Sequence, residues 1–303
     1  MPSTATIKSR PAVRRELSYR DPIDIDGLFA FLARRAVAGV EEVLDGVYRR
    51  SLRLPRGPAV LELAPGAGSV EARFWLEDRR DLPAAVERSR ALLDLDADPH
   101  AVTAALGADP VLGALVHRSP GRRVPGHVDG DELAVRAVLG QQISVAAATT
   151  LAARLVAAYG EPLERPVGSV THLFPTSQAL AGIDPVALAM PAARRRAVLG
   201  LVAALSRGDV KLSTCTDRAR TEQALLALPG IGPWTASYIA MRGLGDADAF
   251  LPTDLGVRRG LEALGHDGRP AAAAAIAERW RPYRAYAVQH LWAAAAAREA
   301  VAR

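Results

Sequence analysis

The sequence predicts an α+β protein that is mostly helical, in which a small α/β region comes first and a larger helical body follows. Apolar and polar residues alternate in short stretches between residues 43 and 76, as in half-buried strands, and glycines and prolines separate these stretches. From about residue 100 onward the chain is rich in alanine and leucine at helical spacing, with no convincing strand. A chain of 303 residues, 50% of them hydrophobic, is long enough for two or three subdomains.

The first 20 residues carry much of the positive charge. They hold five basic side chains and one acidic side chain, whereas the whole chain has a formal net charge of only +5. The remainder is therefore close to neutral, so affinity for a polyanion must come from the placement of its charges and not from their sum. We expect residues 1–20 to form a disordered basic arm.

Residues 21–98 are expected to form an α/β subdomain, in which one helix lies against a small antiparallel sheet. Asp26 is placed to cap a helix that carries Phe31. A second helix, over residues 82–95, would cover one face of the sheet. The strands are predicted at three alternating stretches, residues 43–54, 59–63 and 69–76.

The helical body is expected to contain two subdomains, one formed by residues 99–129 with 248–303 and the other by residues 130–247. Within the second, Asp129 or Asp131 opens a helix. The helix runs into the segment LGQQIS, residues 139–144, which places two amides and a hydroxyl where apolar residues would be the default. Either Gly140 allows a close helix contact and the glutamines face solvent, or the amides serve binding.

The segment LPGIGPWTA, residues 228–236, places Gly230 and Gly232 two residues apart just before a helical run. The backbone N–H groups of such a turn are free to face an anion, which indicates a phosphate-binding site. Turns of this type also simply connect two helices, so both interpretations remain open.

Asp254 follows a short apolar segment that ends at Pro252, and it stands at the start of the next helical pattern. Such an aspartate can be an N-cap or a catalytic carboxylate. Its position shortly after a phosphate-binding turn suggests chemistry on nucleic acid.

Five segments spread along the chain resemble the DNA-3-methyladenine glycosylase II family, a branch of the helix-hairpin-helix DNA glycosylase superfamily. The segments are FLARRAV at residues 31–37, the PGHVD and VLGQQISVA pair, LPGIGPWTASYIAMRG, FLPTDLGVRR and ERWRPYRAYAVQHLW. The resemblance implies an N-terminal subdomain similar to half of a TATA-binding-protein fold, followed by two helical subdomains with the active cleft between them.

The resemblance implies a monofunctional enzyme that flips alkylated bases, of the 3-methyladenine and 7-methylguanine type, out of damaged double-stranded DNA and hydrolyses their N-glycosidic bonds. Asp254 falls on the catalytic aspartate of the family. The pocket positions that match are Phe31, Trp234, Tyr238 and Trp292. Aromatic faces of this kind attract a cationic base by roughly 0.5 to 2 kcal/mol.

The resemblance also implies that Gly230, Gly232 and Thr235 bind a DNA phosphate. The carbonyls of Leu226, Leu228 and Gly230 would hold a sodium or potassium ion, the one cofactor expected. Two positions depart from the family pattern. Gln142 stands where the best-known member of the family has a leucine wedge, so that Gln142 or the neighbouring Ile143 would fill the gap left by the base. Leu255 stands where that member has a tyrosine, which suggests a roomier, less aromatic pocket.

Bifunctional relatives carry a Schiff-base lysine two residues after the second glycine of the hairpin, a position that is Trp234 here, and the only lysines are Lys8 and Lys211. One cysteine, Cys215, excludes a four-cysteine zinc or iron-sulfur site. The alternatives that remain are a non-catalytic helix-hairpin-helix DNA-binding protein and a lyase-competent glycosylase. Without a membrane-length apolar run or a signal sequence, a bacterial, cytoplasmic, nucleoid-associated monomer is expected.

Overall fold

The computed structural model describes residues 11–184, 188, 190–213 and 216–301. Lys8 and Cys215, on which part of the sequence argument rests, lie outside the described residues. None of the helices in this described part is both long enough and apolar enough to span a lipid bilayer.

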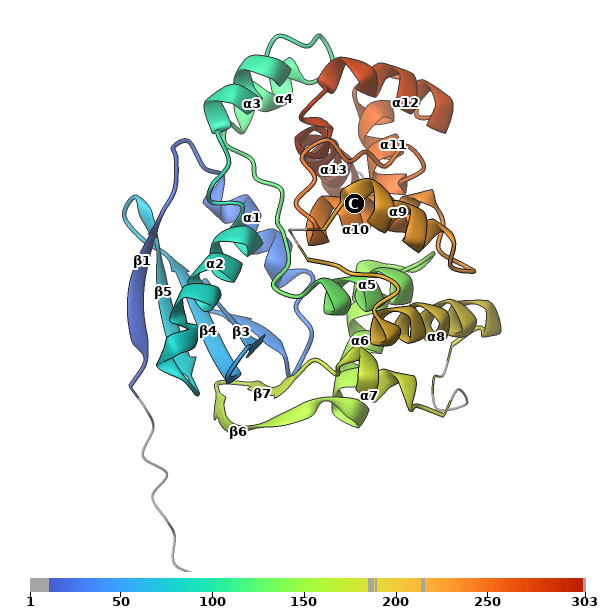
Figure 1. The fold of residues 1–303 in the computed structure, drawn as a ribbon. Coiled ribbons are helices and arrows are strands. Elements are labelled where there is room, and N and C mark those ends of the chain that lie inside the picture. The colour runs from blue at the N-terminus through green and yellow to red at the C-terminus, as the bar shows by residue number, and fades with distance from the viewer. Residues whose placement is uncertain (1–10, 185–187, 189, 214–215, 302–303) are drawn as a thin grey trace, which may run out of the picture.

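A five-stranded antiparallel sheet forms the N-terminal part of the molecule, with the strand order β1-β5-β4-β3-β2 (Figure 1). Its strands are β1 (Val13–Ser18), β2 (Glu41–Leu44), β3 (Val47–Leu54), β4 (Gly57–Pro65) and β5 (Ser69–Leu76). Helices α1 (Ile25–Ala33) and α2 (Leu82–Leu93) pack on the sheet and share one hydrophobic core with it, in which Leu28 and Leu92 join Phe74. This is the α/β arrangement that the alternating pattern predicts.

Residues 13–18 form strand β1, so the prediction of a disordered arm over residues 1–20 is wrong for this stretch. Leu17 is buried and pairs with Val70 of β5. The charged residues 14–16 hide the alternation in the sequence, because β1 lies at the edge of the sheet and turns one face to solvent.

Two local details also differ from the sequence prediction. Asp24, and not Asp26, caps α1, since its Oδ1 accepts a hydrogen bond from the Gly27 N–H at 3.0 Å. The stretch 43–54 is two strands joined at Asp45 and Gly46, whose φ angles are 52° and 75°. A two-residue turn with both φ angles positive is typical of a tight β-hairpin.

The prediction that no strand follows residue 100 is also wrong. Strands β6 (Glu161–Val167) and β7 (Val170–Leu173) form a hairpin with an irregular register, and Leu163 and Val170 pack against Val60 of the sheet. In the sequence, Pro162 argues against a strand at β6. A proline has no N–H group to donate, but an edge strand tolerates it at a position that faces away from the partner strand.

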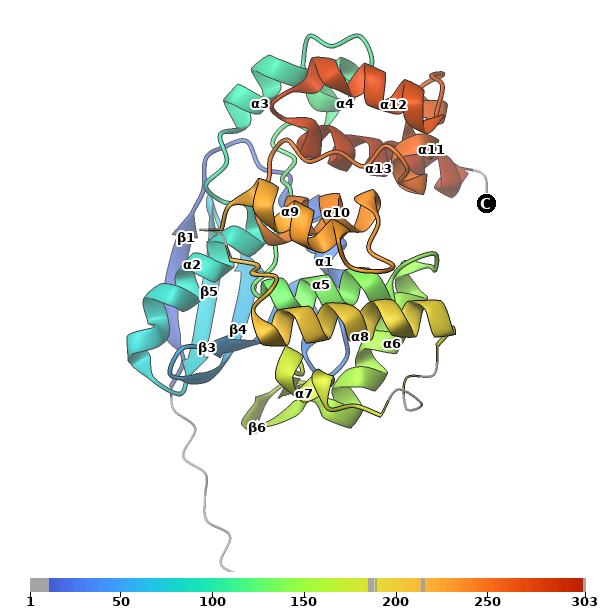
Figure 2. The same ribbon diagram turned by 45° about the vertical axis from the view of Figure 1, so that its right-hand side comes forward.

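The helices of the body form two groups, which Figure 2 shows on either side of α10. Their cores are separate, and α10 supplies Ile239 to one core and Met241 to the other. The helices are α3 (Pro99–Leu106), α4 (Gly113–Arg118), α5 (Gly130–Leu139), α6 (Val145–Tyr159), α7 (Ser177–Ala181), α8 (Ala192–Arg207), α9 (Arg218–Leu226), α10 (Pro233–Gly243), α11 (Leu255–Ala263), α12 (Pro270–Ala277) and α13 (Arg284–Val301). Of the two caps considered for α5, Asp129 is the one used, through the Glu132 N–H.

Candidate functional site

A cavity of about 500 Å³ lies where α1, α5, α6, α10 and α13 meet. The fold brings residues from distant parts of the sequence to its wall, namely Phe31, Trp234, Tyr238, Asp254 and Trp292. Leu255 is also a predicted pocket residue, but it is 54% exposed and lies outside the cavity lining. Leu255 is the first residue of α11, directly after Asp254.

Asp254 is both the N-cap of α11 and a wall of the cavity, so the two interpretations of its sequence position do not exclude each other. Its Oδ1 accepts hydrogen bonds from the Val257 N–H at 2.9 Å and from Trp292 Nε1 at 2.7 Å. Its Oδ2 accepts one from Trp234 Nε1 at 2.9 Å. Both carboxyl oxygens therefore act as hydrogen-bond acceptors. Three donors fix the orientation of the carboxylate.

Gly256 makes the contact between Trp292 and Asp254 possible. A Cβ atom at this position would lie 2.6 Å from Trp292 Cδ1 and 3.1 Å from Asp254 Oδ1. A side chain here would push the indole away from the carboxylate. This role cannot be predicted from the sequence, because the residue that requires a glycine here, Trp292, is distant in sequence.

The aromatic residues form two stacked pairs. Trp234 and Tyr238, one turn apart on α10, stack with ring centroids 5.2 Å apart and an interplanar angle of 13°. Phe31 of α1 and Trp292 of α13 stack at 6.3 Å and 15°. The flat walls suit a planar heteroaromatic ligand.

Two arginines that the sequence analysis missed lie against these rings. The guanidinium carbon of Arg35 is 3.8 Å from the centroid of Phe31, and that of Arg242 is 4.8 Å from Phe31 and 5.7 Å from Tyr238. Both arginines line the cavity. Each follows a pocket aromatic by four residues, the helical spacing that could have revealed them. Their charges occupy aromatic faces that were predicted to attract a cationic base.

Burial alters the proton affinity of these groups. Desolvation lowers the pKa of Arg35 to about 10, with the nearby Arg242 adding to the effect. Burial alone would raise the pKa of Tyr238, but the Arg242 and Arg35 charges outweigh it, so the pKa of the Tyr238 hydroxyl is lowered. Arg35 therefore remains charged at neutral pH, because its lowered pKa still lies well above 7. Arg242 Nη1 donates a hydrogen bond to the Tyr238 hydroxyl at 2.9 Å.

The glycine-rich turn connects α9 to α10 as a helical hairpin. Gly230 has a φ of +84°, and an added Cβ would lie 2.7 Å from Ala197 Cβ of α8. The conformation and the close packing both require glycine. Gly232 is exposed at the N-terminus of α10, with open space where a Cβ would be. An anion can therefore approach the helix start at Gly232, although Pro233, the first helical residue, has no N–H group to offer.

Two of the three carbonyls predicted to hold a monovalent cation already accept hydrogen bonds. The Leu228 carbonyl accepts the Ile231 N–H at 3.1 Å, and the Gly230 carbonyl accepts Gln141 Nε2 at 2.9 Å. A carbonyl oxygen has two lone pairs, so each retains one for an ion.

Thr235 and the two glutamines lie close to the hairpin. The Thr235 side chain is buried. Gln141 Nε2, which also binds the Gly230 carbonyl, donates a hydrogen bond to Thr235 Oγ1 at 3.0 Å, so this hydroxyl faces the loop 140–144 and not solvent. Gln142 is exposed and has a φ of 57°, a left-handed conformation that is uncommon for residues other than glycine. Ile143 lines the cavity.

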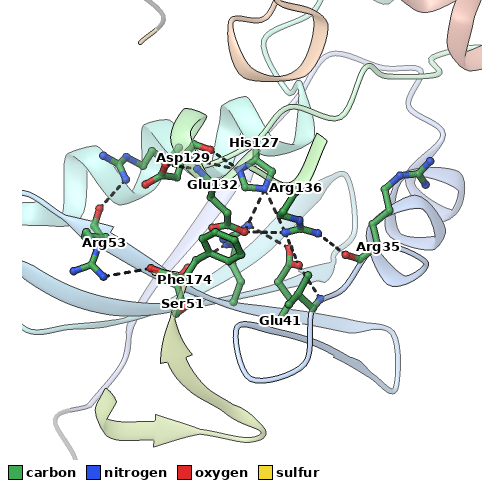
Figure 3. A network of polar contacts seen from close by, with 12 residues as sticks. Arg35, Glu41, Ser51, Arg53, His127, Asp129, Glu132, Arg136 and Phe174 are labelled. Carbon is green, nitrogen blue, oxygen red and sulfur yellow. Dashed lines mark hydrogen bonds and ion pairs between the residues drawn. The ribbon is translucent and has the colours of Figure 1, made fainter. Parts of the chain in front are cut away.

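A buried network of ion pairs connects the sheet to the cavity (Figure 3). Glu41 of β2 binds Arg50 of β3 at 3.2 Å and Arg136 of α5 at 2.9 Å. Glu132 of α5 binds the same two arginines, at 2.7 and 2.8 Å. Arg136 Nη2 also donates to the Arg35 carbonyl at 2.5 Å. The N-terminal sheet thus holds both α5 and the end of α1 in place beside the cavity.

Comparisons with known proteins show the family to which this chain belongs. A family model described as the AlkA N-terminal domain matches residues 14–129. Over 282 residues the chain is 38% identical to DNA-3-methyladenine glycosylase 2 of Escherichia coli, and the match covers 91% of this chain and 95% of that protein. The chain belongs to the DNA-3-methyladenine glycosylase II family.

One further relative and one solved structure extend this comparison. The chain is 51% identical over 284 residues to a protein of Mycobacterium tuberculosis described as a probable bifunctional transcriptional activator/DNA repair enzyme. The match covers 94% of this chain but 57% of that protein. This chain therefore spans little more than half of that relative. A 3-methyladenine DNA glycosylase structure from Archaeoglobus fulgidus shares the fold, with a TM-score of 0.79, 22% identity and coverage of 92% of this chain and 97% of that one.

Proposed function

We propose that this chain is a monofunctional DNA glycosylase that releases alkylated bases from damaged double-stranded DNA. The observation that carries this proposal is the Asp254 carboxylate, which two indole N–H groups fix at the wall of a cavity large enough for a base. The names of the relatives support the same activity. Every group used in the scheme belongs to one chain, which supports action as a monomer.

Base flipping requires a contact that binds the DNA backbone and a side chain that fills the gap left in the DNA base stack. The exposed N-terminus of α10 at Gly232 offers N–H groups to a phosphate. The base enters the cavity, and unstacking it costs a few kcal/mol. Gln142, which is exposed in the loop 140–144, would occupy the vacated position and hydrogen-bond the orphaned partner base.

In the chemical step the bond between C1′ of the sugar and the base nitrogen breaks, and the base keeps the electron pair. A base alkylated at N3 or N7 leaves as a neutral molecule and needs no proton. The sugar becomes an oxocarbenium-like cation, which the ionised Asp254 stabilises electrostatically. Water then adds its oxygen to C1′ and gives up a proton, for which Asp254 can act as the acceptor.

Arg35 and Arg242 change the expected mode of recognition. A cationic base stacked on these walls meets two guanidinium groups as well as the aromatic faces, so the gain from cation–π attraction is reduced. Stacking on flat walls does not depend on charge, and it serves cationic and neutral bases alike.

The direct test is to incubate the protein with randomly methylated duplex DNA and to identify released bases by mass spectrometry. We expect free methylpurines and intact strands. Strand cleavage without added base would indicate a lyase, and binding without any release would indicate a non-catalytic phosphate clamp.

A monofunctional enzyme forms no covalent bond to the sugar, so borohydride should trap no protein–DNA adduct. Position 234, where bifunctional relatives place the lysine, is the indole that binds Asp254. The assay is denaturing electrophoresis after reduction on a damaged duplex. A trapped band would contradict the assignment, and a variant with Lys211→Arg would show whether that lysine forms it.

Gln142→Ala should weaken binding to a duplex with an abasic-site analogue by roughly two- to tenfold, the value of one hydrogen bond. Binding to intact duplex should change little, because the plug matters only after a base has left the stack. Fluorescence anisotropy on the two duplexes measures both. Equal losses on both would place the wedge elsewhere, with Ile143 as the next candidate.

Base release should not depend on divalent metals. The part of the chain that the structure describes contains no group of three His, Cys, Asp or Glu side chains that could hold one. We propose a sodium or potassium ion at the hairpin carbonyls of Leu226, Leu228 and Gly230, where it would affect DNA affinity. Loss of activity in EDTA that zinc or magnesium restores would contradict the first expectation, and comparison of sodium with tetramethylammonium buffers tests the second.

A further inference from the structure

Gln141 connects two segments that lie far apart in the sequence. It belongs to the loop 140–144 between α5 and α6, and its side-chain Nε2 donates to the Gly230 carbonyl at 2.9 Å and to Thr235 Oγ1 at 3.0 Å. Both acceptors belong to the hairpin and the first turn of α10. One amide thus joins the loop that carries Gln142 to the proposed phosphate-binding turn.

The orientation of this amide is determined by chemistry. A backbone carbonyl can only accept, so the Gln141 atom facing Gly230 must be the NH2 group. A glutamate would place an acceptor against an acceptor, and an aspartate or asparagine would be one methylene too short to reach both atoms. Among the natural side chains, glutamine matches the length and the two donors that this position uses.

The backbone of Gln141 is held as well. Its carbonyl accepts Arg194 Nη2 of α8 at 2.5 Å. The same helix provides Ala197, against which Gly230 packs. Loop, hairpin and the start of α8 therefore form one connected unit, and Gln141 contacts the other two parts.

The residue that follows adopts a conformation that needs such support. Gln142 has a φ of 57° and is exposed, so its own side chain supplies no packing that would hold it there. A left-handed residue with a side chain persists where neighbouring contacts fix the backbone. Gln141 is the anchored residue on its N-terminal side.

We propose that Gln141 is a positioning residue that couples phosphate binding at the hairpin to insertion of the loop 142–143 into the DNA. When the hairpin seats on a phosphate, the amide sets the distance and angle at which the loop meets the base stack. This inference rests on the proposed glycosylase function. Its consequence is that loss of the amide impairs recognition of a gap in the stack more than recognition of DNA as such.

The test compares Gln141→Met with wild type on two duplexes, one intact and one with an abasic-site analogue opposite 2-aminopurine. Methionine keeps the length and loses both donors. We expect the preference for the abasic duplex to fall by about five- to tenfold, as for one or two lost hydrogen bonds, while affinity for intact duplex stays within about twofold. The 2-aminopurine signal, which reports insertion into the gap, should lose at least half of its amplitude at saturating protein.

The matched control is Gln178→Met, the same substitution at an exposed glutamine of α7 outside the cavity lining. It should leave the preference and the signal unchanged. An unchanged preference with full fluorescence amplitude in Gln141→Met would overturn the coupling, as would equal losses on both duplexes. If wild type itself shows neither preference nor base release, the proposed function fails, and this outcome is distinct from failure of the coupling.

Discussion

Asp254→Asn should lower the rate of base release by about 100-fold or more, which corresponds to about 2.7 kcal/mol of lost transition-state stabilisation. The carboxylate faces a cavity that also holds the guanidinium groups of Arg35 and Arg242. Without the negative charge, an oxocarbenium-like sugar would form close to two positive charges and no compensating anion at the same place. The loss should therefore appear in single-turnover rates and not in ground-state DNA affinity.

Asp254→Asn also changes the hydrogen bonds that hold this side chain. Asparagine can keep one oxygen for the Val257 N–H and one indole, but its NH2 group then faces the other indole N–H. Two donors facing each other cost about 1–3 kcal/mol, so the variant should fold with reduced stability. Asp98→Asn is the control, because Asp98 also caps a helix, α3, through its side chain and lies outside the cavity lining.

The nature of the leaving group provides a second readout. An N7-alkylguanine leaves readily as a neutral base. Hypoxanthine leaves from a neutral nucleotide, so its departure depends more on transition-state stabilisation by the carboxylate. Asp254→Asn should therefore slow hypoxanthine release more than 7-methylguanine release. Wild-type rates on both substrates would mean that Asp254 serves as a helix cap only.

Strands β3 to β5 and helix α2 were predictable because apolar residues recur along them and glycines and prolines separate the strands. The structure contains these elements close to the predicted ranges. Strand β1 and the β6–β7 hairpin were missed because charged residues 14–16 and Pro162 mask their alternation. Both lie at edges, where one face contacts solvent and the sequence is free to vary.

The site was predictable where a residue has an unusual local neighbourhood in sequence. Asp254 after Pro252 and the Gly230 turn are signals of that kind. Gln141 is visible in the sequence only as one of two amides, because its role depends on Gly230 and Thr235, which the tertiary structure brings near. Arg35 lies four residues after Phe31, but this spacing alone does not distinguish it from a solvated arginine. A lone arginine or glutamine on a helix end is by default a solvated residue.

Glu41→Gln should lower the free energy of unfolding by about 3–5 kcal/mol, a large part of the 5–15 kcal/mol typical of a domain. Glu41 and Glu132 balance Arg50 and Arg136 inside the protein, and three of these four side chains are at most 5% exposed. The nearby arginines outweigh the effect of burial and keep the pKa of Glu41 below its usual value, so the carboxylate is charged in the folded state. Glutamine preserves the shape but leaves one buried guanidinium charge without a counterion.

The cost should reach the cavity, because Arg136 holds the Arg35 carbonyl while its guanidinium depends on Glu41. Urea denaturation measures the stability change, and base release at a temperature where the variant stays folded measures the effect on the site. Glu161→Gln is the control, since it removes the same charge from an exposed ion pair. The Glu161 side chain is 55% exposed, and that of its partner Arg53 is 34% exposed. Exposed pairs contribute about 0–1 kcal/mol, so the control should be nearly neutral. If Glu41→Gln were equally mild, the two guanidinium groups would have to be solvated, and the network could not be the rigid link between the sheet and the cavity.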